Sequence, residues 1–268
     1  MIMDIIMAFN TGFLLPALTA IYSLFNHNSN VRLHVLYVEL SENAQIVIKK
    51  LEGVGDGNRV EFLPIEGKLL ERIKVATGRW RQETFFRYYI TEIIPGLDRA
   101  LWLDADILVR KSVEELYNID FEEKSFAGVY DNTSDPETRL GISDYVNAGI
   151  LMINTKKLHE TGKMKKFWDL VASPDYKGEL PDQDALNIVF ENDIREIGTK
   201  FNTFPLNPDK YADYLIENAV IIHFVSKYKP WKAEDVDYFN ESFKHFRTAA
   251  VFVPEYWDAC GKAVTFIE

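Results

Sequence analysis

Two aspartates, Asp104 and Asp106, stand one residue apart inside the apolar run LWLDADILV, which extends from Leu101 to Val109. Moving an unpaired carboxylate from water into a protein interior costs several kcal/mol, so two acids in such a run need a partner that neutralises them. In a strand, alternate side chains point to the same face, and both acids would then face the same partner. We expect that partner to be a divalent metal ion.

The D-x-D spacing is weak evidence by itself, because two other pairs in the chain share it. Asp235 and Asp237 lie in the polar stretch KAEDVDYFN, which is typical of a solvated surface. Asp182 and Asp184 follow Pro181 and open an expected helix, where the helix dipole favours acids whether or not they have a function. Only the apolar surroundings of the first pair therefore single it out.

The first pair has an alternative interpretation of its own. The strand could end at Leu103, which would leave Asp104 and Asp106 in an exposed turn. Active sites of open α/β sheets lie at the carboxyl ends of strands, and that is where this pair falls. We therefore favour a metal site over a surface turn.

A third ligand would have to come from elsewhere in the chain, and His223 has the most suggestive context of the five histidines. It ends the apolar run AVIIHF and begins HFVSKYKPW, which places Lys227 and Lys229 just after it. A cation beside a metal ligand is useful where both bind one phosphate-bearing molecule. The alternative is a core histidine followed by a solvated basic turn.

The elements that would position these residues alternate in the manner of an α/β protein with a parallel sheet and crossover helices. Pro16 and Ser41 are typical of helix N-termini. We find no repeat or linker, and expect one domain, residues 1–268, with an irregular C-terminal third. The expected strands are 5–8, 31–38, 60–65, 101–109, 126–130, 146–154 and 219–223, and the expected helices are 14–26, 41–54, 82–94 and 182–191.

Composition excludes several classes of protein. The formal net charge of -11 argues against binding of nucleic acid, which needs a clustered basic surface. Cys260 is the only cysteine, so no intrachain disulfide is expected. The N-terminus lacks the features of a secretory signal, and no apolar run approaches the roughly 20 residues of a transmembrane helix. We expect a cytoplasmic protein, free or at the inner face of the membrane, and its oligomeric state stays open.

Four motifs in order resemble glycosyltransferase family 8, the retaining, nucleotide-sugar-dependent enzymes that include bacterial galactosyl- and glucosyltransferases and glycogenin. They are LWLDADILV, YVNAGILMIN (145–154), LPDQDALN (180–187) and HFVSKYKPW (223–231). The resemblance covers nearly the whole chain. It implies a GT-A fold, a Rossmann-like single domain in which the D-x-D motif holds Mn²⁺ on the diphosphate of a UDP-sugar.

The same resemblance implies roles for individual residues. Asp104, Asp106 and His223 would bind Mn²⁺, or alternatively Mg²⁺, and Lys229 would contact the phosphates. A mixed carboxylate and imidazole set suits Mn²⁺, which accepts nitrogen more readily than Mg²⁺ does. The other donor-binding positions that the resemblance implies are Ala8, Asn10, Arg87, Ala105, Asn147 and Ser226.

The expected catalytic residues are Gln183 and Asp182. By resemblance, Asn147 and Asp182 grip hydroxyls of the transferred sugar, and Gln183 lies nearest the anomeric carbon on its β face. An amide is a poor nucleophile, which favours attack from the face of the leaving group, with Gln183 stabilising the oxocarbenium-like centre. Asp182 is the alternative nucleophile.

Two positions depart from the family pattern. Asn10 stands where the family usually has an aspartate that contacts uridine, and an amide oxygen can still accept a hydrogen bond from uracil. Ser226 replaces a usual glycine, and its Cβ would be strained if that residue required a positive φ.

Together these features predict a metal-dependent retaining hexosyltransferase that moves glucose or galactose from UDP-glucose or UDP-galactose to a glycan, glycolipid or glycoprotein. Asp131 and the loop 132–145 are expected to contact the acceptor. One alternative is a family member that binds a nucleotide sugar with little turnover. Another is a metal-dependent nucleotidyltransferase, although MAFNTGFLLP after the first expected strand has no glycine-rich phosphate loop.

Overall fold

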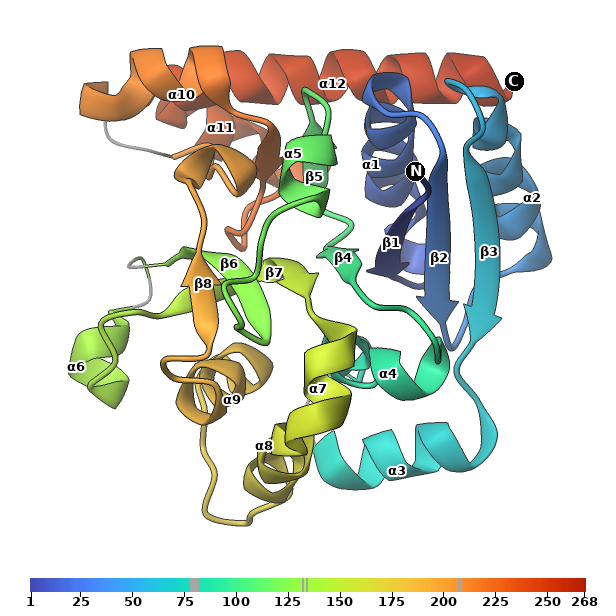
Figure 1. The fold of residues 1–268 in the computed structure, drawn as a ribbon. Coiled ribbons are helices and arrows are strands. Elements are labelled where there is room, and N and C mark those ends of the chain that lie inside the picture. The colour runs from blue at the N-terminus through green and yellow to red at the C-terminus, as the bar shows by residue number, and fades with distance from the viewer. Residues whose placement is uncertain (78–81, 132, 134, 207–208) are drawn as a thin grey trace.

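The computed structural model describes residues 1–77, 82–131, 133, 135–206 and 209–268 (Figure 1). The strands are β1 (Met3–Ala8), β2 (Val31–Tyr37), β3 (Arg59–Pro64), β4 (Ala100–Leu103), β5 (Ile107–Val109), β6 (Phe126–Tyr130), β7 (Val146–Ile153), β8 (Ile194–Glu196) and β9 (Ile221–His223). The α-helices are α1 (Leu14–His27), α2 (Glu42–Lys50), α3 (Gly67–Thr77), α4 (Ile90–Ile93), α5 (Glu114–Tyr117), α6 (Pro136–Leu140), α7 (Thr155–Thr161), α8 (Lys163–Val171), α9 (Pro181–Val189), α10 (Ala212–Asn218), α11 (Val236–Ser242) and α12 (Arg247–Ile267). Short 3-10 helices are η1 (Thr11–Phe13), η2 (Leu51–Gly53), η3 (Glu83–Tyr88), η4 (Thr199–Phe201), η5 (Asp209–Tyr211) and η6 (Ala233–Asp235).

The described strands form a seven-stranded sheet in the order β3-β2-β1-β4-β7-β6-β8 and a small sheet of β5 and β9. In the large sheet β1 pairs in parallel with β2 and β4, and β6 pairs in parallel with β8. β7 runs antiparallel to both of its neighbours, β4 and β6. The predicted α/β class with a mostly parallel sheet is confirmed.

Helices cover both faces of the large sheet, because its strands are apolar on both faces. Alternation along β1 sends Ile5 and Met7 into a core with α1 and α2, while Ile6 packs in a second core with η3, α8 and α9. α12 lies along one side of the molecule and packs against α1, α10 and α11 (Figure 1). None of the helices in the described part of the chain has the length and apolarity needed to cross a membrane.

The predicted single strand 101–109 is wrong. The chain leaves the large sheet after Leu103, where β4 pairs with β7, and enters the small sheet at Ile107, where β5 pairs with β9. The two sheets are separate, so residues 104–106 belong to neither β4 nor β5 and form the crossing between the sheets. The two acids thus lie at the carboxyl end of β4, as the alternative interpretation placed them, but not in an exposed turn.

Other differences follow from local energetics. The expected helix 41–54 is α2 followed by η2, and Ser41 caps it, because its Oγ accepts a hydrogen bond from Ala44 N–H at 3.2 Å. The expected helix 82–94 is η3 followed by the short α4. The expectation of an irregular C-terminal third is wrong, because this part of the chain contains the long helix α12. Pro254 and Gly261 lower the helix propensity of α12, but its buried face packs on α1 and stabilises it.

Candidate active site

Strand pairing brings three separated residues together. The pairing of β5 with β9 places His223 opposite Ile107, and hence beside Asp106. At the end of β4, the Asp104 N–H donates a hydrogen bond to the Gly149 carbonyl of β7 at 2.8 Å. Asp104, Asp106 and His223 therefore meet where the large and small sheets adjoin.

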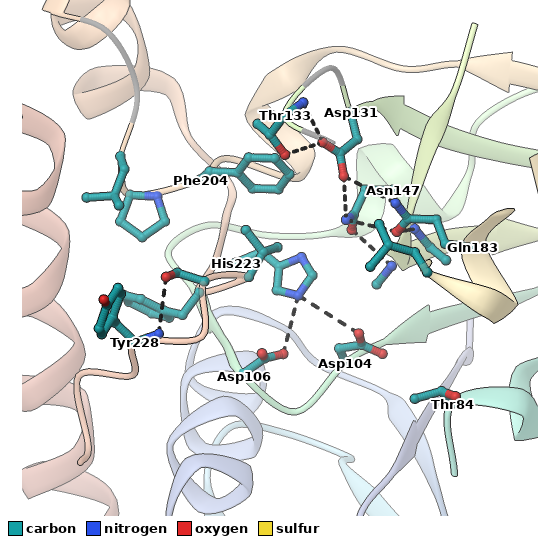
Figure 2. A pocket seen from close by; sticks show the side chains of 18 of the residues that line it. Thr84, Asp104, Asp106, Asp131, Thr133, Asn147, Gln183, Phe204, His223 and Tyr228 are labelled. Carbon is teal, nitrogen blue, oxygen red and sulfur yellow. Dashed lines mark hydrogen bonds and ion pairs between the residues drawn. The ribbon is translucent and has the colours of Figure 1, made fainter. Parts of the chain in front are cut away.

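The three side chains converge on one point. His223 Nε2 lies 3.3 Å from Asp106 Oδ1 and 3.9 Å from Asp104 Oδ2 (Figure 2). One ligand atom from each residue lies within 4.8 Å of the other two. A Cβ added at Gly149 would stand 2.1 Å from His223 Cε1 and 2.9 Å from Asp104 Oδ2, so only glycine leaves this space open. The space and its donors fit a divalent cation such as Mn²⁺.

Lysine 229 lies beside this cluster. Its Nζ donates to Asp106 Oδ2 at 2.7 Å and to the Phe224 carbonyl at 2.5 Å. Burial raises the pKa of the Asp106 carboxyl. His223 and Lys229 lower this pKa by more than burial raises it, so it falls well below its usual range. Asp106 is therefore ionised, as a metal ligand must be.

The buried Arg87 connects the cluster to the start of α9. Its Nη2 lies 3.2 Å from Asp104 Oδ1 and 3.7 Å from Asp182 Oδ2, and its Nη1 donates to the Ala148 carbonyl. Trp102 Nε1 donates to the same Asp104 oxygen at 2.8 Å. Burial raises the pKa of Asp182 to about 6, with Arg87 lowering it and Asp104 raising it. One guanidinium thus orients two acids.

A hydrogen-bonded amide cluster forms the neighbouring wall. Gln183 Oε1 accepts from the Ala148 N–H at 2.9 Å and from Asn147 Nδ2 at 3.2 Å. Asp131 Oδ2 accepts from Asn147 Nδ2 at 3.2 Å and from Gln183 Nε2 at 3.3 Å. These side chains are buried and mutually oriented, so the polar groups they present have fixed positions.

The two walls line one cavity of about 490 Å³ (Figure 2). The sequence-predicted site residues in its lining are Arg87, Asp104, Asp106, Asn147, Asp182, Gln183, His223 and Ser226, and Asp131 also lines it. Four predicted positions lie outside the lining: Lys229 binds Asp106, Ala105 is buried between the two acids, Ala8 is half-buried at the end of β1, and Asn10 is exposed. An apolar stretch, Phe204, Pro205 and Leu206, completes the lining, and no sequence pattern had indicated it.

Two further expectations have clear structural outcomes. Ser226 is not among the residues with positive φ, and its Oγ accepts from the Tyr228 N–H at 3.1 Å, so its Cβ causes no strain. The expectation that Asp235 is solvated is wrong: it is buried and accepts from the Lys229 N–H at 2.7 Å. In the predicted acceptor loop 132–145, residues 132 and 134 lie outside the described residues.

Asp184, which the sequence left without a role, anchors the start of α9. It is fully buried and accepts from Arg139 Nη1 and Nη2 at 3.1 Å each, from Tyr145 Oη at 2.5 Å, and from the Leu180 N–H at 3.1 Å. These bonds hold the first turn of α9, and with it Asp182 and Gln183, against β7.

We expect Asp184→Ala to lower the free energy of unfolding by about 3 kcal/mol, because it removes the acceptor that the half-buried Arg139 guanidinium shares with the buried Tyr145 hydroxyl. Urea unfolding followed by circular dichroism measures the change. Asp169→Ala is the matched control, since Asp169 pairs with Lys165 on an exposed helix surface. Equal stability of the two variants would contradict the anchoring role.

Comparisons with known proteins agree with this geometry. Residues 4–235 match the family Glycosyl transferase family 8. The glycosyltransferase GlyF of Streptococcus pneumoniae serotype 4 is 26% identical over 251 residues, which are 91% of this chain and 61% of GlyF. The lipopolysaccharide 1,3-galactosyltransferase of Salmonella typhimurium is 32% identical over 179 residues, which are 60% of this chain and 53% of that enzyme. The chain thus spans about half to three-fifths of the length of these relatives.

A solved structure shares the architecture. The galactosyltransferase LgtC, in complex with donor and acceptor sugar analogues, superposes with a TM-score of 0.75 and 22% sequence identity, over 97% of this chain and 96% of that one. This likeness shows that the fold is the predicted GT-A fold. Since the family match extends over most of the chain, the protein belongs to glycosyl transferase family 8.

Proposed function

We propose that the protein is a metal-dependent, retaining hexosyltransferase that moves glucose or galactose from a UDP-sugar to a glycan or glycoconjugate. The observation that carries the proposal is one cavity with a three-residue cation site on one wall and an oriented amide and carboxylate cluster on the other. Family membership and the similarity to a lipopolysaccharide 1,3-galactosyltransferase support it.

The donor would lie across the cavity with its diphosphate at Asp104, Asp106 and His223. A bound Mn²⁺ would there supply positive charge to the diphosphate oxygens. Lys229 Nζ, which now pairs with Asp106, is close enough to this site to add a second positive charge to a bound phosphate. The hexose would then lie toward Asn147, Asp182 and Gln183.

The reaction breaks the bond between the anomeric carbon and the β-phosphate oxygen and forms a bond from that carbon to the oxygen of an acceptor hydroxyl, whose proton passes to the departing phosphate oxygen. Negative charge grows on the leaving UDP, and Lys229 would stabilise it, together with the positive charge of a metal ion held by Asp104, Asp106 and His223. Positive charge grows on the sugar ring, which lies near Asp182 and Asp131. A carboxylate with a pKa of about 6 is mostly ionised above neutral pH, so Asp182 can stabilise that charge.

Retention of configuration requires a covalent intermediate or attack from the leaving-group face. Gln183 Oε1 already accepts two hydrogen bonds, from Ala148 N–H and Asn147 Nδ2, which lowers the reactivity of an oxygen that is a poor nucleophile in any case. We therefore favour attack from the leaving-group face, with Gln183 beside the anomeric carbon. Asp182 is the alternative nucleophile.

The acceptor would enter beside Asp131 and the apolar lining of Phe204, Pro205 and Leu206. Sugar rings pack their C–H faces on such side chains while a carboxylate orients their hydroxyls. This part of the cavity lies at the carboxyl ends of the strands, where loops of α/β folds carry specificity.

A donor screen tests the proposal. The full chain is incubated with UDP-glucose, UDP-galactose or GDP-mannose in Mn²⁺, Mg²⁺ or EDTA, and nucleoside diphosphate release is measured with and without lactose and lipo-oligosaccharide acceptors. We expect release from one of the UDP-hexoses, at least about tenfold faster in Mn²⁺ than in EDTA. Equal release in EDTA would refute metal dependence, and saturable UDP-sugar binding without release would favour the low-turnover alternative.

A further inference from the structure

Asn202 lies between the two walls of the cavity, although it belongs to none of the sequence motifs. It follows η4, is buried, and its backbone N–H donates to the Thr199 carbonyl at 3.2 Å. Its side-chain Nδ2 donates to Asn147 Oδ1, and its Oδ1 contacts His223 Nδ1, both at 3.0 Å. A single amide therefore links the amide cluster of Asn147 and Gln183, the sugar wall, to the cluster of Asp104, Asp106 and His223, the metal wall.

Backbone groups determine which way the amides in this chain of hydrogen bonds point. The Gly149 N–H can only donate, so the Asn147 atom that it contacts at 3.0 Å must be the oxygen. The Ala148 N–H fixes the oxygen of Gln183 in the same way, at 2.9 Å. Asn147 Nδ2 then faces two acceptors, Gln183 Oε1 and Asp131 Oδ2, which agrees with the orientation set by Gly149.

This orientation passes through Asn202 to the histidine. Because Asn147 Oδ1 is an acceptor, Asn202 must turn its NH₂ group toward it, and its oxygen then faces His223 Nδ1. An amide oxygen can only accept, so Nδ1 must carry the proton. His223 Nε2 is the ring nitrogen that faces Asp104 and Asp106, so it is the nitrogen whose lone pair can bind a metal ion.

We propose that Asn202 is a positioning residue, which holds His223 in the metal-binding tautomer and couples the metal site to Asn147 on the sugar wall. The inference rests on the proposed metal site. It goes beyond that site because it explains the orientation of His223 by a series of hydrogen bonds that begins at the backbone N–H of Gly149 and passes through Asn147 and Asn202. With Nδ1 donating to Asn202, Nε2 is the nitrogen that can give its lone pair to a cation between the two carboxylates, so this arrangement favours cation binding.

Two substitutions of Asn202 distinguish its hydrogen bond to His223 from its hydrogen bond to Asn147. Asn202→Asp keeps an acceptor for His223 Nδ1–H but faces Asn147 Oδ1 with a second oxygen. Asn202→Leu has a similar volume and removes both links. Free Mn²⁺ is titrated by electron paramagnetic resonance against the full chain. We expect the leucine variant to lose about 10- to 100-fold in Mn²⁺ affinity, and the aspartate variant to keep wild-type affinity within about threefold.

The aspartate variant should also separate the KM for the UDP-sugar from the affinity for Mn²⁺. Asn202→Asp should raise the KM for the UDP-sugar, because repulsion displaces Asn147, while its Mn²⁺ affinity is retained. Equal loss of Mn²⁺ affinity in the two variants would show a merely structural role and overturn the inference. Wild-type affinity in Asn202→Leu would overturn it too. If the wild-type chain itself does not bind Mn²⁺, it is the proposed function that fails.

A measurement on the wild-type chain keeps the inference testable if Asn202→Leu does not fold. With ¹⁵N-labelled histidine and saturating Mg²⁺, the ring nitrogens of His223 are assigned by comparison with His223→Gln. We expect the proton on Nδ1. An Nδ1 without a proton would contradict the whole series of amide orientations.

Discussion

Asp106→Asn is expected to reduce Mn²⁺-dependent sugar transfer by about 10³-fold at saturating UDP-sugar while leaving the chain folded, because charge stabilisation of the leaving diphosphate is the main contribution to catalysis. The amide keeps the size and shape of the carboxylate and one acceptor for Lys229 Nζ, which lies 2.7 Å from Asp106 Oδ2. It loses the negative charge that a metal ligand supplies. Initial rates of UDP release, with a Mn²⁺ titration of the same sample, measure both effects.

The control for this variant comes from the same chain. Asp237 belongs to another D-x-D pair and is exposed, so Asp237→Asn changes the net charge equally without reaching the cavity. We expect it to match the wild-type chain in rate and in Mn²⁺ affinity. Full Mn²⁺-dependent activity in Asp106→Asn would rule out the metal assignment, and loss of activity with unchanged Mn²⁺ affinity would assign Asp106 to the substrate instead.

The fold class could be predicted from the sequence because its signals are local. The short runs rich in apolar and β-branched residues that became β1, β2, β3, β6 and β7 stand out along the chain, and signals such as Ser41 mark where helices begin. The break between β4 and β5 could not be predicted. All of LWLDADILV is compatible with a strand, and only the pairing partners, β7 on one side and β9 on the other, separate its two halves.

Site residues could be predicted where they lie in a motif. Asp104, Asp106 and His223 do meet, and the reason is the register of β5 with β9, which no spacing along the chain reveals. Asn202 was missed because an isolated asparagine in a loop carries no pattern. Asp235 was misread as a surface residue because its neighbours are polar, whereas tertiary contact with Lys229 buries it.

Glycine 149 is where packing and chemistry constrain the chain most tightly, and Gly149→Ala is expected to abolish Mn²⁺ binding, with a loss of at least about 100-fold in affinity. The added Cβ would stand 2.1 Å from His223 Cε1 and 2.9 Å from His223 Nε2. β7 cannot move aside, because it is buried between β4 and β6. The imidazole must therefore turn away, which breaks its bond to Asn202 and withdraws Nε2 from the two acids.

Overpacking of this kind also destabilises the fold, by about 1 to 3 kcal/mol, and a double-mutant cycle identifies its source. If the alanine methyl clashes with the imidazole, Gly149→Ala should cost less in a His223→Ala background, with a coupling free energy of about 1 kcal/mol in urea unfolding. Gly198→Ala is the matched control, since a Cβ there meets open space and its φ is -63°. Additive costs would mean that the methyl is accommodated elsewhere. Unchanged Mn²⁺ affinity in Gly149→Ala would argue against a cation bound between Asp104 and His223, because the methyl group would displace the imidazole.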